Sequence, residues 1–156
     1  MAHEQPELLK DLAADEVQKI LAFGTKITVP IGGSLFRLGD TAERLFLIER
    51  GLIRLTLPMK VRGSEEDVVV EERTSGQTVG WSALIPPYRF TLAATAPLET
   101  QVLALPREEL RKHLAANPVV GYKIALNLAV IIGHRLQLFQ AMWLREMQRM
   151  VEKHSA

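Results

Sequence analysis

The sequence lacks cysteine, an excess of charge of one sign and a continuous hydrophobic run of membrane-spanning length. Without cysteine the chain has no disulfides, no thiol nucleophile and no iron–sulfur or zinc-finger ligands. Its 19 Lys and Arg residues balance 18 Asp and Glu residues, so charge gives no general reason to expect binding to nucleic acid or to an anionic membrane. The most apolar stretch, residues 124–132, has about half the length that a spanning helix needs, and we assign it to a core or an interface.

What is present is a chain of 156 residues, 47% of them hydrophobic, which fits one domain. A chain of this length can bury a sizeable core without disulfides or a structural metal. Residues 1–6 carry acid and proline where an export signal needs a basic start and an apolar run, so we expect a cytoplasmic protein.

The spacing of apolar residues predicts helix, then strands, then helix. A step of three or four residues over positions 7–23 indicates one helix or two short ones, ended by Gly24. The β-prone runs that follow complete about eight strands, and we interpret residues 60–67 as a solvated hairpin loop. These runs lie at residues 26–29, 34–36, 44–48, 52–57, 68–74, 90–96 and 99–105.

Two prolines then mark the return to helix. Pro106 suits the first position of a short helix, and Pro118 suits the first position of a long one that continues to about Glu152. The sequence therefore predicts an α+β fold, with an eight-stranded antiparallel β-roll (jelly-roll), an N-terminal helix and a long C-terminal helix. We divide the chain into residues 1–117, which hold the roll and its flanking helices, and residues 118–156, which form the long helix.

The long helix carries two adjoining apolar stripes. The first contains Ala125, Ala129, Ile132, Leu136, Phe139, Trp143, Met147 and Met150, and the second contains Leu128, Ile131, Leu138 and Met142. We expect one stripe to face the roll and the other to face a second copy, because an uncovered stripe of this length is a liability in a monomer. The alternative is a helix that folds back entirely onto its own domain.

Residues 33–55 combine glycines at turns with alternating apolar positions. Gly39 and Gly51 supply backbone freedom, and the alternation between them gives the strands an inward face. In this ordered set the chain resembles the cyclic nucleotide-binding domain family, the sensor domain of regulators of the Crp/Fnr type. The resemblance covers almost the whole chain and implies a β-roll with a dimerisation helix, without the DNA-binding domain of those regulators.

The resemblance also implies a ligand site in a strand-turn-helix cassette at residues 76–84 and just beyond it. The implied site residues are Val79, Gly80, Trp81, Ser82, Ala83, Leu84, Arg89 and Thr91. Backbone N–H groups at a helix start, together with one guanidinium, suit a phosphate group. The implied ligand is a cyclic nucleotide, cAMP or cGMP.

Two residues depart from the family pattern. Family members that bind cyclic nucleotides usually have a Glu after the glycine that matches Gly80, whereas here Trp81 follows, and an indole cannot accept hydrogen bonds from a ribose. Phe90 separates Arg89 from Thr91, and this one-residue offset points Arg89 away from the pocket, so that Phe90 takes the place of the phosphate. Three interpretations stay open: retained nucleotide binding, a pocket remodelled for another small ligand, and a ligand-free roll used for dimerisation or protein contact.

The other polar residues indicate neither a metal site nor an enzyme. The histidines stand far apart without carboxylates at ligand spacing, and we interpret Glu71 and Glu72 as solvated strand-edge charge. The resemblance also allows a haem-based sensor with His113 or His134 as an axial ligand, and the alternative role for each histidine is that of a solvated helix residue. We expect a non-enzymatic, homodimeric sensor module that contacts no nucleic acid or membrane and signals to an unidentified protein partner.

Overall fold

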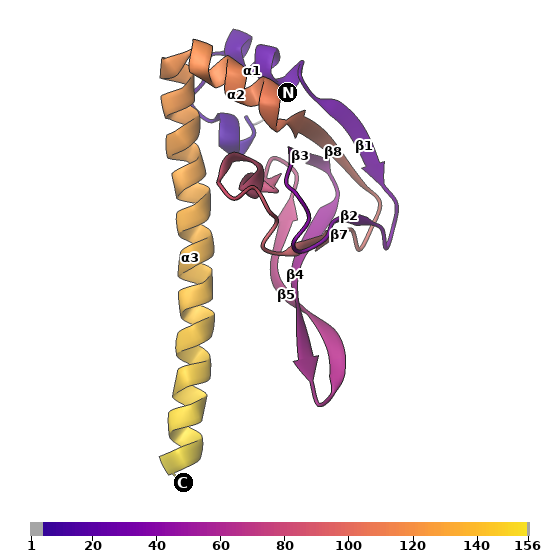
Figure 1. The fold of residues 1–156 in the computed structure, drawn as a ribbon, viewed down its shortest axis with the longest axis vertical. Helices are drawn as coiled ribbons and strands as arrows, with labels where there is room; N and C mark the ends of the chain where they lie inside the picture. Colours follow the sequence, from indigo (N-terminus) through magenta and orange to yellow (C-terminus); the bar gives the residue numbers. More distant parts are fainter. Residues whose placement is uncertain (1–4, 156) are drawn as a thin grey trace.

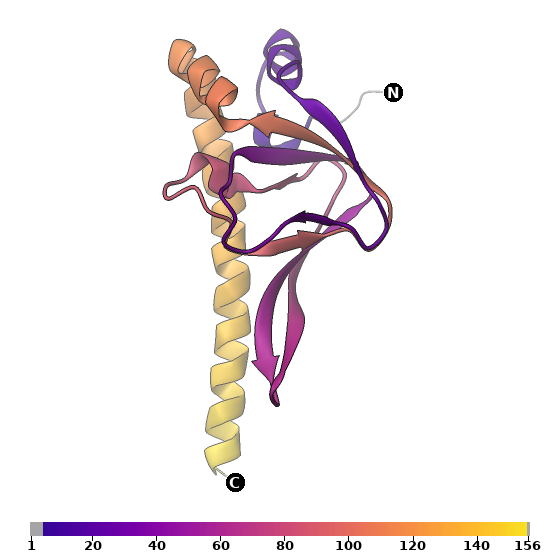
Figure 2. The same ribbon diagram turned by 45° about the vertical axis from the view of Figure 1, so that its right-hand side comes forward.

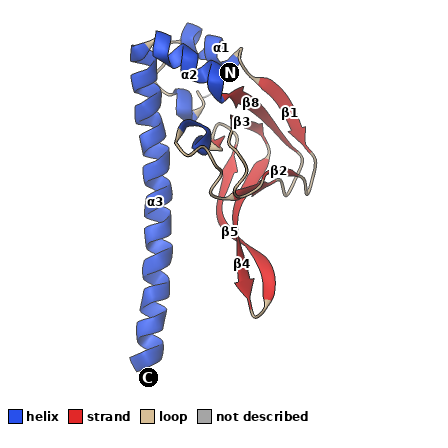
Figure 3. Cartoon of the chain, in the orientation of Figure 1, coloured by secondary structure: helices blue, strands red, loops and turns tan. Residues whose placement is uncertain are grey.

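The computed structural model describes residues 5–155, which form a roll of two antiparallel sheets beside one long helix (Figure 1, Figure 3). Each sheet has four strands, in the orders β1-β8-β3-β6 and β2-β7-β4-β5. The strands are β1 Thr25–Val29, β2 Ser34–Phe36, β3 Arg44–Arg50, β4 Leu52–Val61, β5 Ser64–Thr74, β6 Thr78–Val79, β7 Ala93–Thr95 and β8 Thr100–Pro106. The predicted fold class is confirmed, and the expectation drawn from residues 1–6 falls mostly outside the described residues.

The N-terminal segment forms two short helices, η1 Glu7–Leu9 and α1 Ala14–Leu21. Leu8, Leu9 and Ile20 are fully buried, so both helices close the end of the roll with apolar side chains. The amide of Asn127 on the long helix donates to the carbonyls of Leu8 and Lys10, each at 2.9 Å. The N-terminal segment is therefore fastened both to the roll and to the long helix.

The central strand β3 is buried on both faces because different elements cover each side. Phe46 points into the roll, where its ring packs 5.9 Å from that of Phe36. Since successive strand side chains alternate, Leu45 and Leu47 point the other way, and Leu47 lines the same hollow as Leu21 of α1. This arrangement explains why the sequence of β3 is apolar at four consecutive positions rather than alternating.

The interpretation of residues 60–67 as a loop is wrong. β4 and β5 continue as paired strands to a two-residue turn at Arg62 and Gly63, whose φ values of 51° and 83° match the turn that tight hairpins favour. The end of this hairpin projects beyond the roll (Figure 2). Charged residues dominate it because both of its faces meet solvent there, which removes the apolar alternation that marks a half-buried strand.

Two helices complete the chain, α2 Arg107–Ala116 and α3 Pro118–Ser155. α3 has 38 residues and is therefore about 57 Å long at 1.5 Å per residue, so it extends well past the roll (Figure 1). Among the described residues it is the one helix long and apolar enough to cross a membrane, with a mean hydropathy of 1.3 over its most apolar window. Helices of soluble interfaces share this property, so it does not by itself place α3 in a bilayer.

The two apolar stripes of α3 have different surroundings. The stripe with Leu128 and Ile131 is buried, and it continues in the partly buried Leu138 and Met142. The other stripe is largely exposed along residues 136–150, where Trp143 is 62% and Leu136 is 57% exposed. One stripe thus packs on the domain, as expected, and the other is uncovered in the single chain.

Candidate functional site

The predicted cassette is present as strand β6, a left-handed glycine and the short helix η2 Trp81–Leu84. Gly80 has φ +79°, a conformation that residues with a Cβ rarely adopt. A Cβ at this position would also lie 3.2 Å from the rings of both Phe46 and Phe90. Glycine is therefore required here by the backbone and by the close packing of the aromatic side chains.

The structure brings together only part of the predicted site. Gly80, Trp81, Ser82 and Thr91 line one small void of about 20 Å³, together with Phe36, Leu55, Phe90, Leu92 and Arg135. Val79 and Ala83 are fully buried members of the apolar core, and Leu84 packs against that core. The run predicted as a strand at residues 90–96 is ordered as strand only at Ala93–Thr95, so Phe90 and Thr91 belong to a loop.

Phe90 fills the interior of the roll next to the cassette. Its ring stacks on Phe36 with centroids 3.8 Å apart and planes within 9°. The void beside the cassette, about 20 Å³, has room for about one water, whereas pockets for small organic molecules are typically about 300 to 1,000 Å³. A second hollow of about 160 Å³ is lined by the rings of Phe36, Phe46 and Phe90 and by Asp40, Thr41, Glu43 and Arg44. The aromatic rings thus leave no space of ligand size beside the cassette inside the roll.

Arg89 lies outside this interior. It pairs with Thr41 in an isolated β-bridge, and its exposed guanidinium donates from Nη1 to the carbonyl of Gly39 at 3.0 Å. The backbone N–H of Phe90 donates to the carbonyl of Asp40 at 3.0 Å, which fixes this register. In this geometry the phenyl ring points inward and the guanidinium points outward, in agreement with the alternation of neighbouring side chains.

A charged network that the sequence analysis missed joins the roll to α3. Glu71 of β5 accepts from Arg135 Nε at 2.5 Å with one oxygen and from Arg73 Nη1 at 3.0 Å with the other. Arg73 also pairs with Glu7, whose carboxylate accepts from the backbone N–H of Thr78 at 2.8 Å. Our interpretation of Glu71 as solvated charge is therefore wrong, whereas Glu72 is exposed and pairs with the exposed Arg54.

One signal in the sequence could have revealed this network. Arg135 lies in step with the buried stripe of α3, four residues after Ile131 and three before Leu138. A lone arginine within an apolar stripe must find a carboxylate, because an unpaired buried charge is very costly. The spacing could locate the arginine, but the identity of Glu71 as its partner depends on tertiary structure.

A larger groove adjoins the small void, between the roll and α3. We call it the junction groove; it has a volume of about 290 Å³. Its walls are apolar and come from Leu57, Trp81, Leu92, Ile132, Leu136 and Phe139, with Thr91 and Arg135 also in its lining. Arg135 and Trp81 line both the void and the groove, and the guanidinium carbon is 5.9 Å from the centre of the indole ring.

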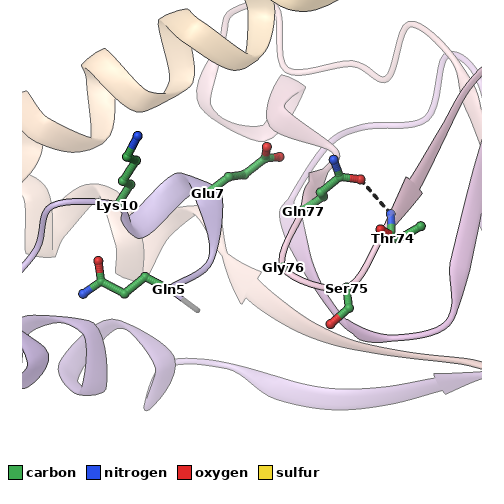
Figure 4. A pocket seen from close by; sticks show the side chains of 7 residues that line it. All are labelled: Gln5, Glu7, Lys10, Thr74, Ser75, Gly76 and Gln77. Atoms are coloured by element: carbon green, nitrogen blue, oxygen red, sulfur yellow. Dashed lines mark hydrogen bonds between the residues drawn. The ribbon is translucent and has the colours of Figure 1, made fainter. Parts of the chain in front are cut away.

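A polar hollow of about 490 Å³ lies elsewhere, where the N-terminal segment meets the turn before β6 (Figure 4). The side-chain oxygen of Gln77 accepts there from the backbone N–H of Thr74 at 2.8 Å, and the carbonyl of Gly76 accepts from the backbone N–H of Glu7 at 2.9 Å. Its other side chains, Gln5, Lys10 and Ser75, are exposed. The hollow is open, and Glu7, Thr74, Gly76 and Gln77 in its lining already bond to one another, so we assign it a structural role.

The two histidines considered as haem ligands have different environments. Nε2 of His113 lies 3.4 Å from the carboxylate of Glu16, and its ring packs edge-on against Phe23 at 5.2 Å. His113 is thus partly buried between α2 and α1 rather than solvated, and His134 is exposed on α3. Among residues 5–155 no group of three or more His, Asp or Glu side chains is placed to hold a metal ion.

These features define a class of protein, a β-roll with a glycine-hinged cassette and a long flanking helix. The chain belongs to the cyclic nucleotide-binding domain family, whose family model matches residues 26–117. Among solved structures it is similar to the catabolite activator protein of Thermus thermophilus, with a TM-score of 0.72 and 26% identity over 91% of this chain and 63% of that one.

Two curated relatives match most of this chain but only part of their own length. The cyclic AMP receptor protein of Thermus thermophilus is 28% identical over 130 residues, which are 83% of this chain and 57% of that protein. Glutaminase 1 of Bradyrhizobium diazoefficiens is 29% identical over 133 residues, 85% of this chain and 20% of that protein. This chain therefore spans about half of the first relative and a fifth of the second.

Proposed function

We propose that the chain is a non-enzymatic, cytoplasmic regulatory module that dimerises through α3 and responds to a small ligand other than a cyclic nucleotide. The observation that carries this proposal is the position of Phe90, which stacks on Phe36 inside the roll while Arg89 lies outside. A phosphate in the roll would have to displace a buried aromatic ring and would not meet Arg89, whose guanidinium is exposed and bonded to the carbonyl of Gly39. Of the three open interpretations, this geometry favours the remodelled pocket.

The exposed stripe of α3 supports the homodimer. Leu136, Phe139, Trp143, Met147 and Met150 follow one another at helical spacing and are all exposed in the single chain. The roll occupies only the adjoining stripe, so a second α3 can cover this one without disturbing the domain. Burial of such a continuous apolar surface is the main favourable term in forming stable helical interfaces.

Arg135 supports a route from ligand to partner. It is the last buried residue of α3, and it contacts the cassette through Trp81 and the roll through Glu71. A ligand that shifts η2 against α3 therefore changes the position of the exposed stripe, and with it the surface seen by the second copy and by a protein partner.

Calorimetry with cAMP and cGMP at millimolar concentration tests the closed roll. We expect no heat of binding with either nucleotide, and the Arg89→Ala variant should behave in the same way because Arg89 faces solvent. Saturable heat with either nucleotide that disappears in Arg89→Ala would show that the cassette retains the family's phosphate site, and the proposal would fail.

Sedimentation tests the dimer with two matched variants. Trp143→Glu places a charge on the exposed stripe and should give a monomer, whereas Val130→Glu places the same charge at a similarly exposed position outside the stripe, 57% against 62%, and should leave a dimer. If the unaltered protein is monomeric at tens of micromolar, or if both variants dimerise, α3 does not form the dimer interface.

The favoured competing function is a ligand-free interaction scaffold with a degenerate pocket, and the small size of the inner void supports it. The two functions differ in whether the junction groove binds anything. The scaffold predicts that α3 and the roll keep the same relative position whatever small molecule is added.

A further inference from the structure

The junction groove joins an apolar surface to one buried guanidinium. Its walls come from the roll, from η2 and from α3, and Trp81 and Phe139 contribute aromatic rings. The side chain of Arg135 is 9% exposed and lies where the groove meets the inner void. A ligand in this groove therefore meets hydrocarbon along most of its length and a cation at one end.

Arg135 has donors to spare. A guanidinium carries five N–H donors, and only Nε of Arg135 makes a hydrogen bond, the one to Glu71. Within residues 5–155, no acceptor is hydrogen bonded to its terminal nitrogens Nη1 and Nη2. These two nitrogens are not among the fully buried side-chain atoms that lack a partner, so solvent reaches them and they can donate to an acceptor supplied from outside the chain.

The charges of the network favour an anionic acceptor. Glu71 pairs with two arginines, with Arg73 through one carboxylate oxygen and with Arg135 through the other. Its single negative charge is therefore shared between two guanidiniums. The two arginine side chains are 8% and 9% exposed, whereas Glu71 and Glu7 are 19% and 30% exposed. The network holds two positive and two negative side chains, and its guanidiniums are the less exposed of them, so an anion beside Arg135 would meet a cation that solvent screens less than it screens the carboxylates.

The geometry points to a binding site for a small carboxylate with an aromatic or aliphatic body, its carboxylate on Nη1 and Nη2 of Arg135 and its body between Trp81 and Phe139. This inference rests on the proposed function and names its ligand class. The planar fork of arginine matches a carboxylate in two parallel hydrogen bonds. The apolar walls exclude a nucleotide, whose sugar and phosphate need many polar partners.

Binding at this site acts on α3 directly. The carboxylate takes Nη1 and Nη2 of Arg135 while Glu71 of β5 keeps Nε, so Arg135 of α3 then binds both the ligand and the roll. Occupancy therefore adds to this ion pair a second connection between α3 and the roll, through the ligand and Trp81 of η2. The site lies beside Leu136 and Phe139, which are part of the exposed stripe.

The experiment uses 4-phenylbutyrate and octanoate as probes, each compared with its neutral amide. Binding is measured by Trp81 fluorescence in a Trp143→Phe background, since these are the only two tryptophans of the chain. We expect both carboxylates to bind and each amide to bind at least tenfold more weakly, because the charge-assisted bonds are lost. This comparison needs no change at Arg135.

Matched variants then locate the site. Arg135→Gln should weaken carboxylate binding by about ten- to a hundredfold, the size expected for charge-assisted hydrogen bonds. Arg54→Gln removes a guanidinium from an exposed pair with Glu72, on the same strand as Glu71, and should leave binding unchanged. Circular dichroism checks that both variants are folded.

Three results would overturn the inference: equal binding of carboxylate and amide, full binding by folded Arg135→Gln, or no binding of either probe at millimolar concentration. Each leaves the dimer and the closed roll standing, since those depend on the nucleotide and sedimentation measurements. Nucleotide binding or a monomeric protein would instead defeat the proposed function while leaving the carboxylate result to stand on its own.

Discussion

The interior of the roll and the junction between the roll and α3 lie side by side but are filled by opposite chemistry. Three phenylalanine rings, Phe36, Phe46 and Phe90, stack inside the roll. At the junction, two arginines and two glutamates form a continuous network next to an open groove. The interior beside the cassette is thus filled by aromatic rings, whereas Arg135 at the junction keeps terminal nitrogens without a hydrogen-bond partner among residues 5–155, which is why we propose the ligand site there.

Phe90→Ala should have the largest effect, because it removes the ring that closes the roll. We expect the free energy of unfolding to fall by about 3–5 kcal/mol, the cost of removing a buried phenyl group and leaving a cavity. Urea denaturation measures this, and Leu38→Ala, at an exposed position in the loop before β3, should change it by less than about 0.5 kcal/mol. Similar values for the two variants would mean that the ring stack does not hold the roll closed.

Glu71→Gln and Glu72→Gln compare the junction with the outer surface of the same strand. Glu71→Gln leaves two largely buried guanidiniums with one carboxylate fewer and should cost about 2–3 kcal/mol. Glu72→Gln breaks only an exposed pair with Arg54 and should cost about 0–0.5 kcal/mol. Thermal or urea unfolding of the two variants gives the difference, and equal costs would refute a structural role for the network.

Gly80→Ala and Gly76→Ala separate backbone strain from packing inside the roll. Both glycines have positive φ, +79° and +85°, so both variants should lose about 1 kcal/mol of stability. A Cβ at Gly80 additionally meets Phe46 and Phe90 at 3.2 Å, whereas one at Gly76 meets nothing within 4 Å, so the Gly80 variant should lose about 1 kcal/mol more. Equal losses would indicate that the rings move aside at little cost.

Sequence reasoning recovered the roll because its signals are local. Glycines at turns and a period of two mark the strands, and a period near 3.6 marks α3 and assigns its stripes. It failed at the end of the β4–β5 hairpin, since charged strands with both faces in solvent show no apolar alternation. It also failed at Glu71, because whether a carboxylate on a strand edge meets water or a guanidinium depends on what the distant α3 brings to it.

In the candidate site, too, the sequence predicted the features that depend on neighbouring residues and missed those that depend on distant ones. The inward position of Phe90 followed from the offset between Arg89 and Thr91, which is a local property of the chain. The junction groove could not be predicted, because its walls come from segments as far apart as Leu57 and Phe139 and exist only when the helix lies against the roll.

The position of Arg135 along α3 gives the helix the proportions of a lever. Twenty residues follow it to Ser155, a length of about 30 Å at 1.5 Å per residue, and none of them is fully buried. A tilt of about 10° pivoting at Arg135 would carry the far end of the rod by about 5 Å. A displacement too small to disturb the packing at the pivot can therefore reach the tip as a movement comparable to the width of a side chain.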